Sequence, residues 1–409
     1  MRHRLLVAAL VLWSPTAAAQ TVTHRGFLET RAVGFAQAAP NDSVRDVEDI
    51  LFREEVFVTL SSWLRIAGGI DVRVNSHGQV DDEWRVDFYD RGVTRPRIAI
   101  RRLNATLTRG RFTLDLGKQF IRWGKADILN PTDRFAPHDF LNLIDSEILP
   151  VMAARPAIQL GSETFEAVWV PRLTPSRLPL FDQRWTMLPT ESHAWTIDDA
   201  GAHIPGRSQW AMRWAHVGEH IELSVSYFDG LSHLPNIDVR LDPSTARAEL
   251  SRFYPDLSTY GGDVAIPTHW GTFKGELAYF ASPSSTNDEY VLYVVEIERQ
   301  IGEWLLDAGY IGEVVTRSGQ AQAFALDRGL ARSIIGRASY TVDPRRTVTI
   351  EGAADQSGRG FYVKGEYSEA VGQHLRLTLT TVGITGQDDD FIGQYHLNSH
   401  ASVRLRFSF

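Results

Sequence analysis

The chain ends in Ala401-Ser-Val-Arg-Leu-Arg-Phe-Ser-Phe409, and this stretch decides the fold class. Apolar residues occupy every second position from Ala401, and Ser or Arg occupies each position between them. Successive side chains of a β-strand point to opposite faces, so the pattern predicts a strand with one apolar and one polar face. The apolar face could meet lipid or a second sheet, and one strand alone does not choose between these.

Similar segments, separated by turn residues, recur along the chain. We predict about 18 strands. Their approximate bounds are 24–36, 52–62, 64–75, 95–108, 111–122, 152–160, 163–171, 208–217, 219–229, 259–270, 272–281, 289–299, 302–316, 329–342, 346–355, 359–369, 373–385 and 395–409. Alternation fails within 95–108 and 111–122, where a β-bulge would change which face Arg97, Arg101, Arg102 and Lys118 occupy.

The connections between these strands mostly alternate between short and long. Tight turns are expected at 109–110, 161–162, 218, 271 and 343–345, and long loops near 76–94, 123–151, 172–207 and 230–258. Short periplasmic turns and long extracellular loops are typical of outer-membrane barrels, although the outer connection at 356–358 is short. The predicted fold is all-β, a transmembrane antiparallel β-barrel of about 16–18 strands.

The N-terminus has the pattern of a secretory signal peptide. Arg2 and Arg4 precede the apolar run 5–13, and Ala17-Ala-Ala19 supplies small residues for cleavage. We expect residues 1–19 to be removed and residues 20–409 to form the barrel in the Gram-negative outer membrane. Cysteine is absent, which argues against a small disulfide-stabilised fold, and no transmembrane helix is expected.

The overall composition fits a barrel but does not prove one. Hydrophobic residues make up 43% of the chain and its net charge is −8. These values are ordinary for a soluble protein, but polar lumen residues dilute lipid-facing ones in a barrel. No basic stripe stands out, so nucleic acid is not an expected partner. Tryptophans near strand ends predict an aromatic girdle at the membrane interfaces, formed by Trp63, Trp123, Trp169, Trp210, Trp214, Trp270 and Trp304.

The segment 117–133 carries the most distinctive motif, Trp123-Gly124 followed by Asn130-Pro-Thr-Asp133. It resembles a motif of an uncharacterised family of proteobacterial outer-membrane barrels, often grouped with porin-like and export-type barrels. That resemblance implies periplasmic lipid-binding and inner-membrane efflux partners. The terminal Phe409 resembles the closing residue of outer-membrane barrels, which the barrel-insertion machinery reads.

From these features we expect a porin-like channel for passive passage of small solutes. Two alternatives stay open: an export or uptake barrel for lipid-like or apolar molecules, and an outer-membrane barrel enzyme. No Gly-x-Ser-x-Gly, His-Glu-x-x-His or phosphate-loop motif occurs, so we name no catalytic residue and expect no cofactor. We also name no metal site, since Asp388-Asp-Asp390 and His138-Asp139 lack calcium-loop spacing and are better explained as solvated loops.

The third outer loop is the expected constriction, although a cap over the barrel mouth is an equal alternative. Its segment 137–149 predicts a short helix, because Pro137 suits a first turn and the apolar residues fall on one side. The charged candidates for the constriction or rim are Arg122, Lys125, Asp127, Asp133, Asp139, Asp145 and Glu147.

Two further sets of residues are expected inside the barrel or at its mouth. The fourth outer loop is unusually apolar, so we expect Phe181, Trp185, Met187 and Leu188 to pack within the protein, with binding of an apolar ligand as the alternative. Strand alternation places a second, charged set on the lumen wall: Arg213, Glu222, Lys274, Glu276, Lys364, Glu366, Arg376, Arg404 and Arg406. A basic wall near Arg404 could then face the carboxylates of the third outer loop across the pore.

Overall fold

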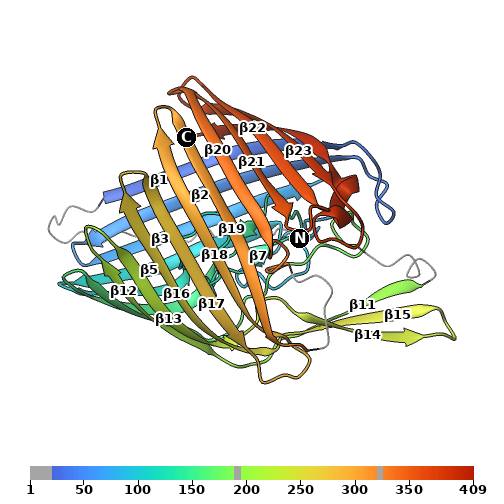
Figure 1. The fold of residues 1–409 in the computed structure, drawn as a ribbon, viewed down its shortest axis with the longest axis horizontal. Helices are drawn as coiled ribbons and strands as arrows, with labels where there is room; N and C mark the ends of the chain where they lie inside the picture. Colours follow the sequence, from blue (N-terminus) through green and yellow to red (C-terminus); the bar gives the residue numbers. More distant parts are fainter. Residues whose placement is uncertain (1–20, 188–194, 320–325) are drawn as a thin grey trace, which may run out of the picture.

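The structure is a computed structural model that describes residues 21–187, 195–319 and 326–409. The expected signal peptide therefore lies outside the described residues. Within them, 18 antiparallel strands close into one barrel (Figure 1). The first strand pairs with both the second and the last, so no strand of the barrel is left with an open edge. The predicted all-β barrel is confirmed.

In chain order, the barrel strands have the following bounds: β1 Thr21–Phe35, β2 Asp46–Ser61, β3 Leu64–Asn75, β5 Ile98–Arg109, β6 Phe112–Gln119, β9 Val151–Leu160, β10 Glu163–Val170, β12 Gln209–Val217, β13 Glu222–Leu231, β16 Asp256–Thr268, β17 Gly271–Ala281, β18 Glu289–Ile301, β19 Trp304–Arg317, β20 Ser333–Asp343, β21 Arg346–Asp355, β22 Phe361–Val371, β23 Leu375–Thr385 and β24 His400–Ser408. Each predicted strand overlaps one of these. The last strand begins at His400 rather than 395 because a 3-10 turn, η2 (Gly393–Asn398), precedes it.

The long connections lie at one end of the barrel and the short turns at the other. We call residues 76–97 loop two, 120–150 loop three, 171–208 loop four and 232–255 loop five. Loop two carries β4 (Val86–Asp87), and loop three carries β7 (His138–Asp139) and β8 (Glu147–Ile148). Loops four and five contribute β11 (Thr196–His203), β14 (Asn236–Asp242) and β15 (Arg247–Phe253), a small sheet that projects from the barrel (Figure 1).

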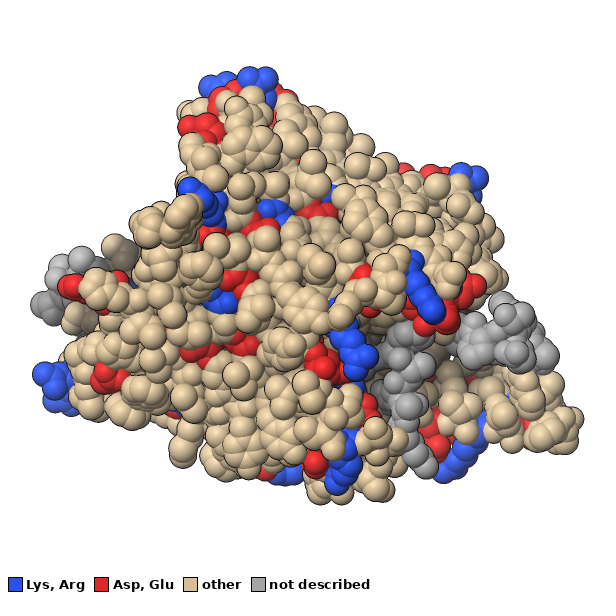
Figure 2. All heavy atoms as spheres, viewed as in Figure 1, with Lys and Arg blue, Asp and Glu red and all other residues tan. Residues whose placement is uncertain are grey.

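The outer face of the barrel is apolar, as alternation predicts. On β24, Val403, Leu405 and Phe407 are 40–49% exposed, whereas Ser402, on the opposite face, is 6% exposed. Uncharged side chains cover most of the face shown in Figure 2. Such a surface is stable when it contacts lipid rather than water.

Aromatic side chains mark both ends of this apolar face. Trp63, Trp270 and Trp304 are exposed beside short turns. Toward the long loops, neighbouring strands carry a row of rings with centroids 4.9–6.4 Å apart, formed by Trp210, Tyr227, Tyr260 and Tyr279. The girdle prediction is wrong for Trp123, which is 3% exposed and packs inside the barrel because its indole donates to Glu166 Oε1.

The hydrophobic core lies inside the barrel rather than between two sheets. Apolar side chains from the inner faces of β16–β23 form its wall, among them Phe280, Leu292 and Ile335. Parts of loops three and four pack against this wall. No helix among the described residues is long and apolar enough to cross a membrane.

Depth in the membrane can be tested on one strand. Ile297 lies on the outward face of β18 between Val295 and Arg299, while Val291 lies beyond the ring of Tyr293 on the same face. Replacement Ile297→Arg should cost about 2–4 kcal/mol of unfolding free energy, and Val291→Arg about 0–1 kcal/mol, because the penalty for a cation falls toward the interface. Guanidinium unfolding in phospholipid vesicles measures both, and equal costs would contradict this placement.

Candidate functional site

Loop three crosses the lumen and divides it into two cavities. At its start it contacts β17 and β18, and near its end it contacts β1, β2, β3, β22 and β24. These contacts are made almost entirely by charged or amide groups. The loop therefore has a fixed path through the barrel, set by the polar side chains of the inner wall.

The start of loop three is held by one buried carboxylate, Glu276 of β17. Its Oε2 accepts hydrogen bonds from the backbone N–H groups of Lys125 (2.9 Å) and Ala126 (3.2 Å) and from Asn130 Nδ2 (3.3 Å). Its Oε1 accepts from the backbone N–H and the hydroxyl of Thr132, both at 2.8 Å. A turn of converging N–H groups can hold an anion in this way.

The distinctive motif of the sequence forms this turn. Gly124 has φ +99, and a Cβ there would lie 2.5 Å from Glu276 Oε2, so only glycine fits. Asn130 and Thr132 supply side-chain donors to the same carboxylate. The motif is therefore explained as the anchor of loop three.

Further polar contacts fix the same region. Glu296 of β18 accepts from the backbone N–H groups of Asp127 (2.8 Å) and Ile128 (3.4 Å). Lys125 pairs with Glu222, and Asp127 with Lys274. Both partners are on the wall because the loop is pressed against it.

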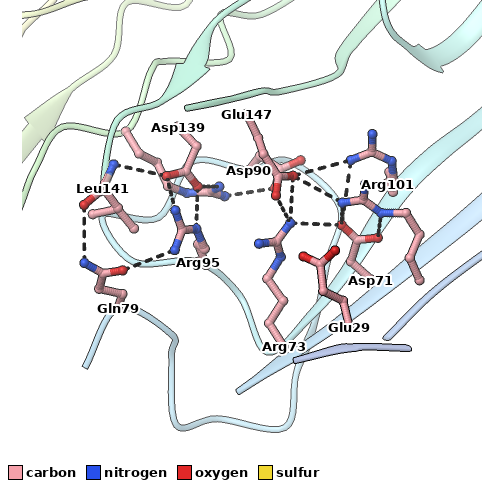
Figure 3. Close-up of polar contacts among 12 residues, drawn as sticks. Glu29, Asp71, Arg73, Gln79, Asp90, Arg95, Arg101, Asp139, Leu141 and Glu147 are labelled. Carbon is pink, nitrogen blue, oxygen red and sulfur yellow. Dashed lines mark hydrogen bonds and ion pairs between the residues drawn. The ribbon is translucent and has the colours of Figure 1, made fainter. Parts of the chain in front are cut away.

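The end of loop three binds the opposite wall. Glu147 Oε2 lies 3.2 Å from Arg53 and 2.8 Å from Arg73, with Arg101 at 3.8 Å (Figure 3). Burial alone would raise the pKa of Glu147, but Arg73 and Arg53 hold it far below its usual range. The loop carboxylates thus contact the basic wall directly, instead of facing it across an open pore as expected.

Asp145 makes a second contact of this kind. It pairs with Arg31 of β1, with Lys364 of β22 (3.2 Å) and, at 3.9 Å, with Arg404 of β24. Burial opposes ionisation, yet these three cations lower the pKa of Asp145 to about 2. The carboxylate is therefore ionised at any physiological pH.

The middle of loop three forms no helix. His138 pairs with Ile148 and Asp139 with Glu147 as the short strands β7 and β8. The buried carboxylate of Asp139 accepts from Arg95 of loop two (2.9 Å) and Arg177 of loop four (3.0 Å) (Figure 3). The helix predicted over 137–149 is wrong because these inter-loop pairs hold the backbone extended.

A basic cavity of about 620 Å³ lies between loop three and the strands near the closure of the barrel. Ten arginines but only four carboxylates line it. We call it the basic chamber. Its arginines are Arg31, Arg53, Arg73, Arg95, Arg101, Arg102, Arg122, Arg184, Arg404 and Arg406.

Seven of these ten arginines were not among the sequence candidates, and five of the seven lie on β1, β2, β3 and β5. The signal that could have found them is the spacing of charges at every second position, as in Glu29 and Arg31 or Asp71 and Arg73. Arg101 and Arg102 are adjacent, yet both line the chamber. A register shift opposite Gly69 and Ile70 places them there, consistent with the predicted bulge in this segment.

A cavity of about 380 Å³ lies on the long-loop side of loop three; its lining is mainly apolar but also includes Asp133, Asp327, Glu351 and Arg134. We call it the vestibule. Phe280, Leu292, Phe391 and Tyr395 contribute to its wall. Arg122, Ser146, Ile148 and Trp185 line both cavities, so the vestibule adjoins the basic chamber.

Arg122 is the most accessible cation at this junction. Its side chain is 62% exposed, and its nearest carboxylate, Asp133, is 3.8 Å away. Burial raises the pKa of Asp133 to about 7, although the backbone N–H of Trp123 and the charge of Arg122 act against this. Below about pH 7, where Asp133 is protonated, the charge of Arg122 is therefore not neutralised by it.

The apolar residues of loop four pack inside the barrel. Trp185 is buried against Tyr395 and His400, and Met187 packs on the same cluster. Phe181 is partly buried beneath the guanidinium of Arg252. Leu188 lies outside the described residues.

All nine lumen-wall candidates lie on the inner face of their strands. Arg213, Glu222, Lys274 and Glu276 lie on β12, β13 and β17; Lys364, Glu366, Arg376, Arg404 and Arg406 lie on β22–β24. The structure does not bring the two groups together. Loop three lies between them. In the second group, Arg404 and Arg406 line the basic chamber and Lys364 pairs with Asp145 of the loop. In the first group, Glu222, Lys274 and Glu276 bind the start of the loop.

The anchoring of loop three can be tested at Gly124. Gly110 also has a positive φ of +60, but a Cβ there meets nothing within 4 Å. Gly110→Ala should cost about 1–2 kcal/mol from backbone strain alone. Gly124→Ala should cost a further amount of about 1–3 kcal/mol, because buried donors lose Glu276, and should add noise to single-channel currents. Thermal unfolding and bilayer recordings measure these effects. If both variants behave alike, Glu276 does not anchor the loop.

Comparisons with known proteins agree with this architecture. The chain matches no protein-family model and no curated protein sequence. Among solved structures it is similar to a BenF-like porin from Pseudomonas fluorescens Pf-5, with 9% identity, 96% of this chain and 98% of that chain covered, and a TM-score of 0.55. It is also similar to Pseudomonas aeruginosa OccK3 (OpdO), with 10% identity, coverages of 94% and 95%, and a TM-score of 0.52. A third similar structure is Pseudomonas aeruginosa OpdK with vanillate, with 12% identity, coverages of 94% and 98%, and a TM-score of 0.51. At these identities the likeness shows the fold, which is that of porin-like outer-membrane barrels.

Proposed function

We propose that this protein is an outer-membrane channel for small organic anions that have an apolar body and a carboxylate. The observation that carries the proposal is the direct contact between the apolar vestibule and the basic chamber, with Arg122 at their junction. The selectivity of such a channel would come from these residues and not from the barrel fold itself.

The physical basis is a two-part recognition. An aromatic or aliphatic body can leave water for the vestibule, which favours entry of apolar solutes. Guanidinium groups match carboxylates in bidentate geometry, so the next chamber favours the anionic end. Because most chamber arginines already pair with wall or loop carboxylates, a solute would bind weakly enough to leave again.

Two of the solved structures named above support this choice. OpdK was solved with vanillate, an aromatic carboxylate, and another similar structure is described as a BenF-like porin. An export barrel for lipid-like molecules is less well supported, because the apolar vestibule leads to arginines rather than to a continuous apolar path. The periplasmic and efflux partners that the motif suggests, and insertion through Phe409, belong to the proposal as untested parts.

Single-channel recording in a planar bilayer tests the proposal. A potassium chloride gradient should give a reversal potential that indicates preference for chloride. Vanillate should produce transient blocks, whereas vanillyl alcohol, which has the same ring without the carboxylate, should not. A barrel that never conducts, or that prefers potassium, would overturn the proposal.

Arg122 should contribute directly to anion capture. Replacement Arg122→Gln should reduce the chloride preference and weaken the block by vanillate about tenfold, the scale expected for loss of one charged hydrogen bond. Arg359→Gln is the matched control, because Arg359 is an exposed loop residue paired with Asp389 and does not line either cavity. Equal effects of the two substitutions would remove Arg122 from the proposed path.

Selectivity should also depend on pH. Asp133 has a raised pKa of about 7, so it is neutral below this pH and ionised above it. Ionisation partly neutralises Arg122, and chloride preference should therefore fall as the pH rises through about 7. Burial and the charge of Arg122 lower the pKa of nearby His138 to about 4, so this group stays neutral over that range. Reversal potentials measured across the range should change in the wild type and stay flat in Asp133→Asn.

A further inference from the structure

A second cluster of charged groups lies on the opposite wall, away from the basic chamber. Glu298 of β18 and Asp307 of β19 are directly opposite each other on neighbouring strands. Asp127 of loop three joins them, and one carboxylate oxygen from each residue lies within 4.8 Å of the others. Like charges placed opposite each other destabilise a sheet, so this arrangement needs a compensating cation.

Lys274 of β17 provides only part of that compensation. Its ammonium lies 2.5 Å from Asp127 Oδ2 and 2.7 Å from Glu298 Oε2. Three carboxylates therefore share one short-range cation. The neighbouring Arg337 pairs with Glu351 at 3.1 Å and makes no ion pair with Asp307.

Asp307 is the group left without a partner. It is only 7% exposed, and its Oδ1 is buried without a hydrogen bond. Among the described residues it forms no hydrogen bond or ion pair. An ionised carboxylate buried in this way is costly unless a cation pairs with it.

We propose that Asp127, Glu298 and Asp307 form a binding site for a divalent metal cation, which ties loop three to β18 and β19. Carboxylate oxygens are the preferred ligands of calcium and magnesium, and both ions also bind water. Asp127 and Glu298 are partly exposed, which lets water complete the coordination. The cation would displace the ammonium of Lys274 from at least one carboxylate, so metal and lysine compete for the cluster.

This competition gives two variants with opposite expected effects. Asp307→Asn removes a ligand charge and should weaken cation affinity at least about tenfold. Lys274→Met removes the competing ammonium and should tighten it, also by about tenfold. Glu366→Gln is the control, because it removes a lumen carboxylate on β22 that is not part of this cluster.

The test uses the full barrel refolded in detergent, so that no lipopolysaccharide is present, and treated with a chelator before dialysis. Isothermal titration with calcium chloride and with magnesium chloride measures affinity, and thermal unfolding with and without each salt gives a second readout, since a bound ion stabilises the folded state. We expect binding by the wild type, weaker binding by Asp307→Asn, tighter binding by Lys274→Met, and no change in Glu366→Gln.

Two results would overturn the proposal. One is the absence of binding by both the wild type and Lys274→Met. The other is unchanged affinity in Asp307→Asn while that variant keeps its barrel circular dichroism. Tighter binding of magnesium than calcium would keep the site but assign it to the smaller ion. These outcomes do not depend on which solute the channel passes.

Discussion

The structure depends most on the hydrogen bonds between Glu276 and the turn at 124–132 of loop three. A buried carboxylate without a nearby cation is usually unfavourable, but backbone N–H groups can stabilise it when they converge on it. These bonds fix where loop three leaves the wall. The division of the lumen into an apolar vestibule and a basic chamber follows from that position, because the same loop forms the boundary of both cavities.

The inner wall combines two ways of filling a barrel. One part packs apolar side chains against the loops and behaves like the core of a soluble protein. The other part carries charges, most of which pair with loop carboxylates, as Arg73 does with Glu147. Pairing offsets the cost of burying charge, and arginines outnumber carboxylates among the residues that line the chamber. The interior thereby places a mainly apolar region beside a charged one.

Strand alternation, together with the pattern of short and long connections, predicted the barrel. Alternation also predicted the inward side of residues such as Lys274 and Arg404, because a strand has only two faces. It could not predict the path of loop three. The apolar spacing of 137–149 favours a helix locally. The carboxylate of Asp139, however, pairs with Arg95 and Arg177, which are far away in sequence, and these pairs hold the backbone extended. For the same reason Trp123 was assigned to the membrane interface although its partner, Glu166, lies inside. The arginines of β1–β3 follow the alternation rule and could have been found from it.

The position of Asp145 has a consequence for assembly. Its carboxylate bridges Arg31 on the first strand and Arg404 on the last, the two strands whose pairing completes the cylinder. These strands come from opposite ends of the chain, so their meeting has a high entropic cost and comes late in folding. The bridge cannot form before that meeting. Closure of the wall therefore completes the contacts of loop three, and an intermediate with a lateral opening between its terminal strands would lack the bridge at Asp145.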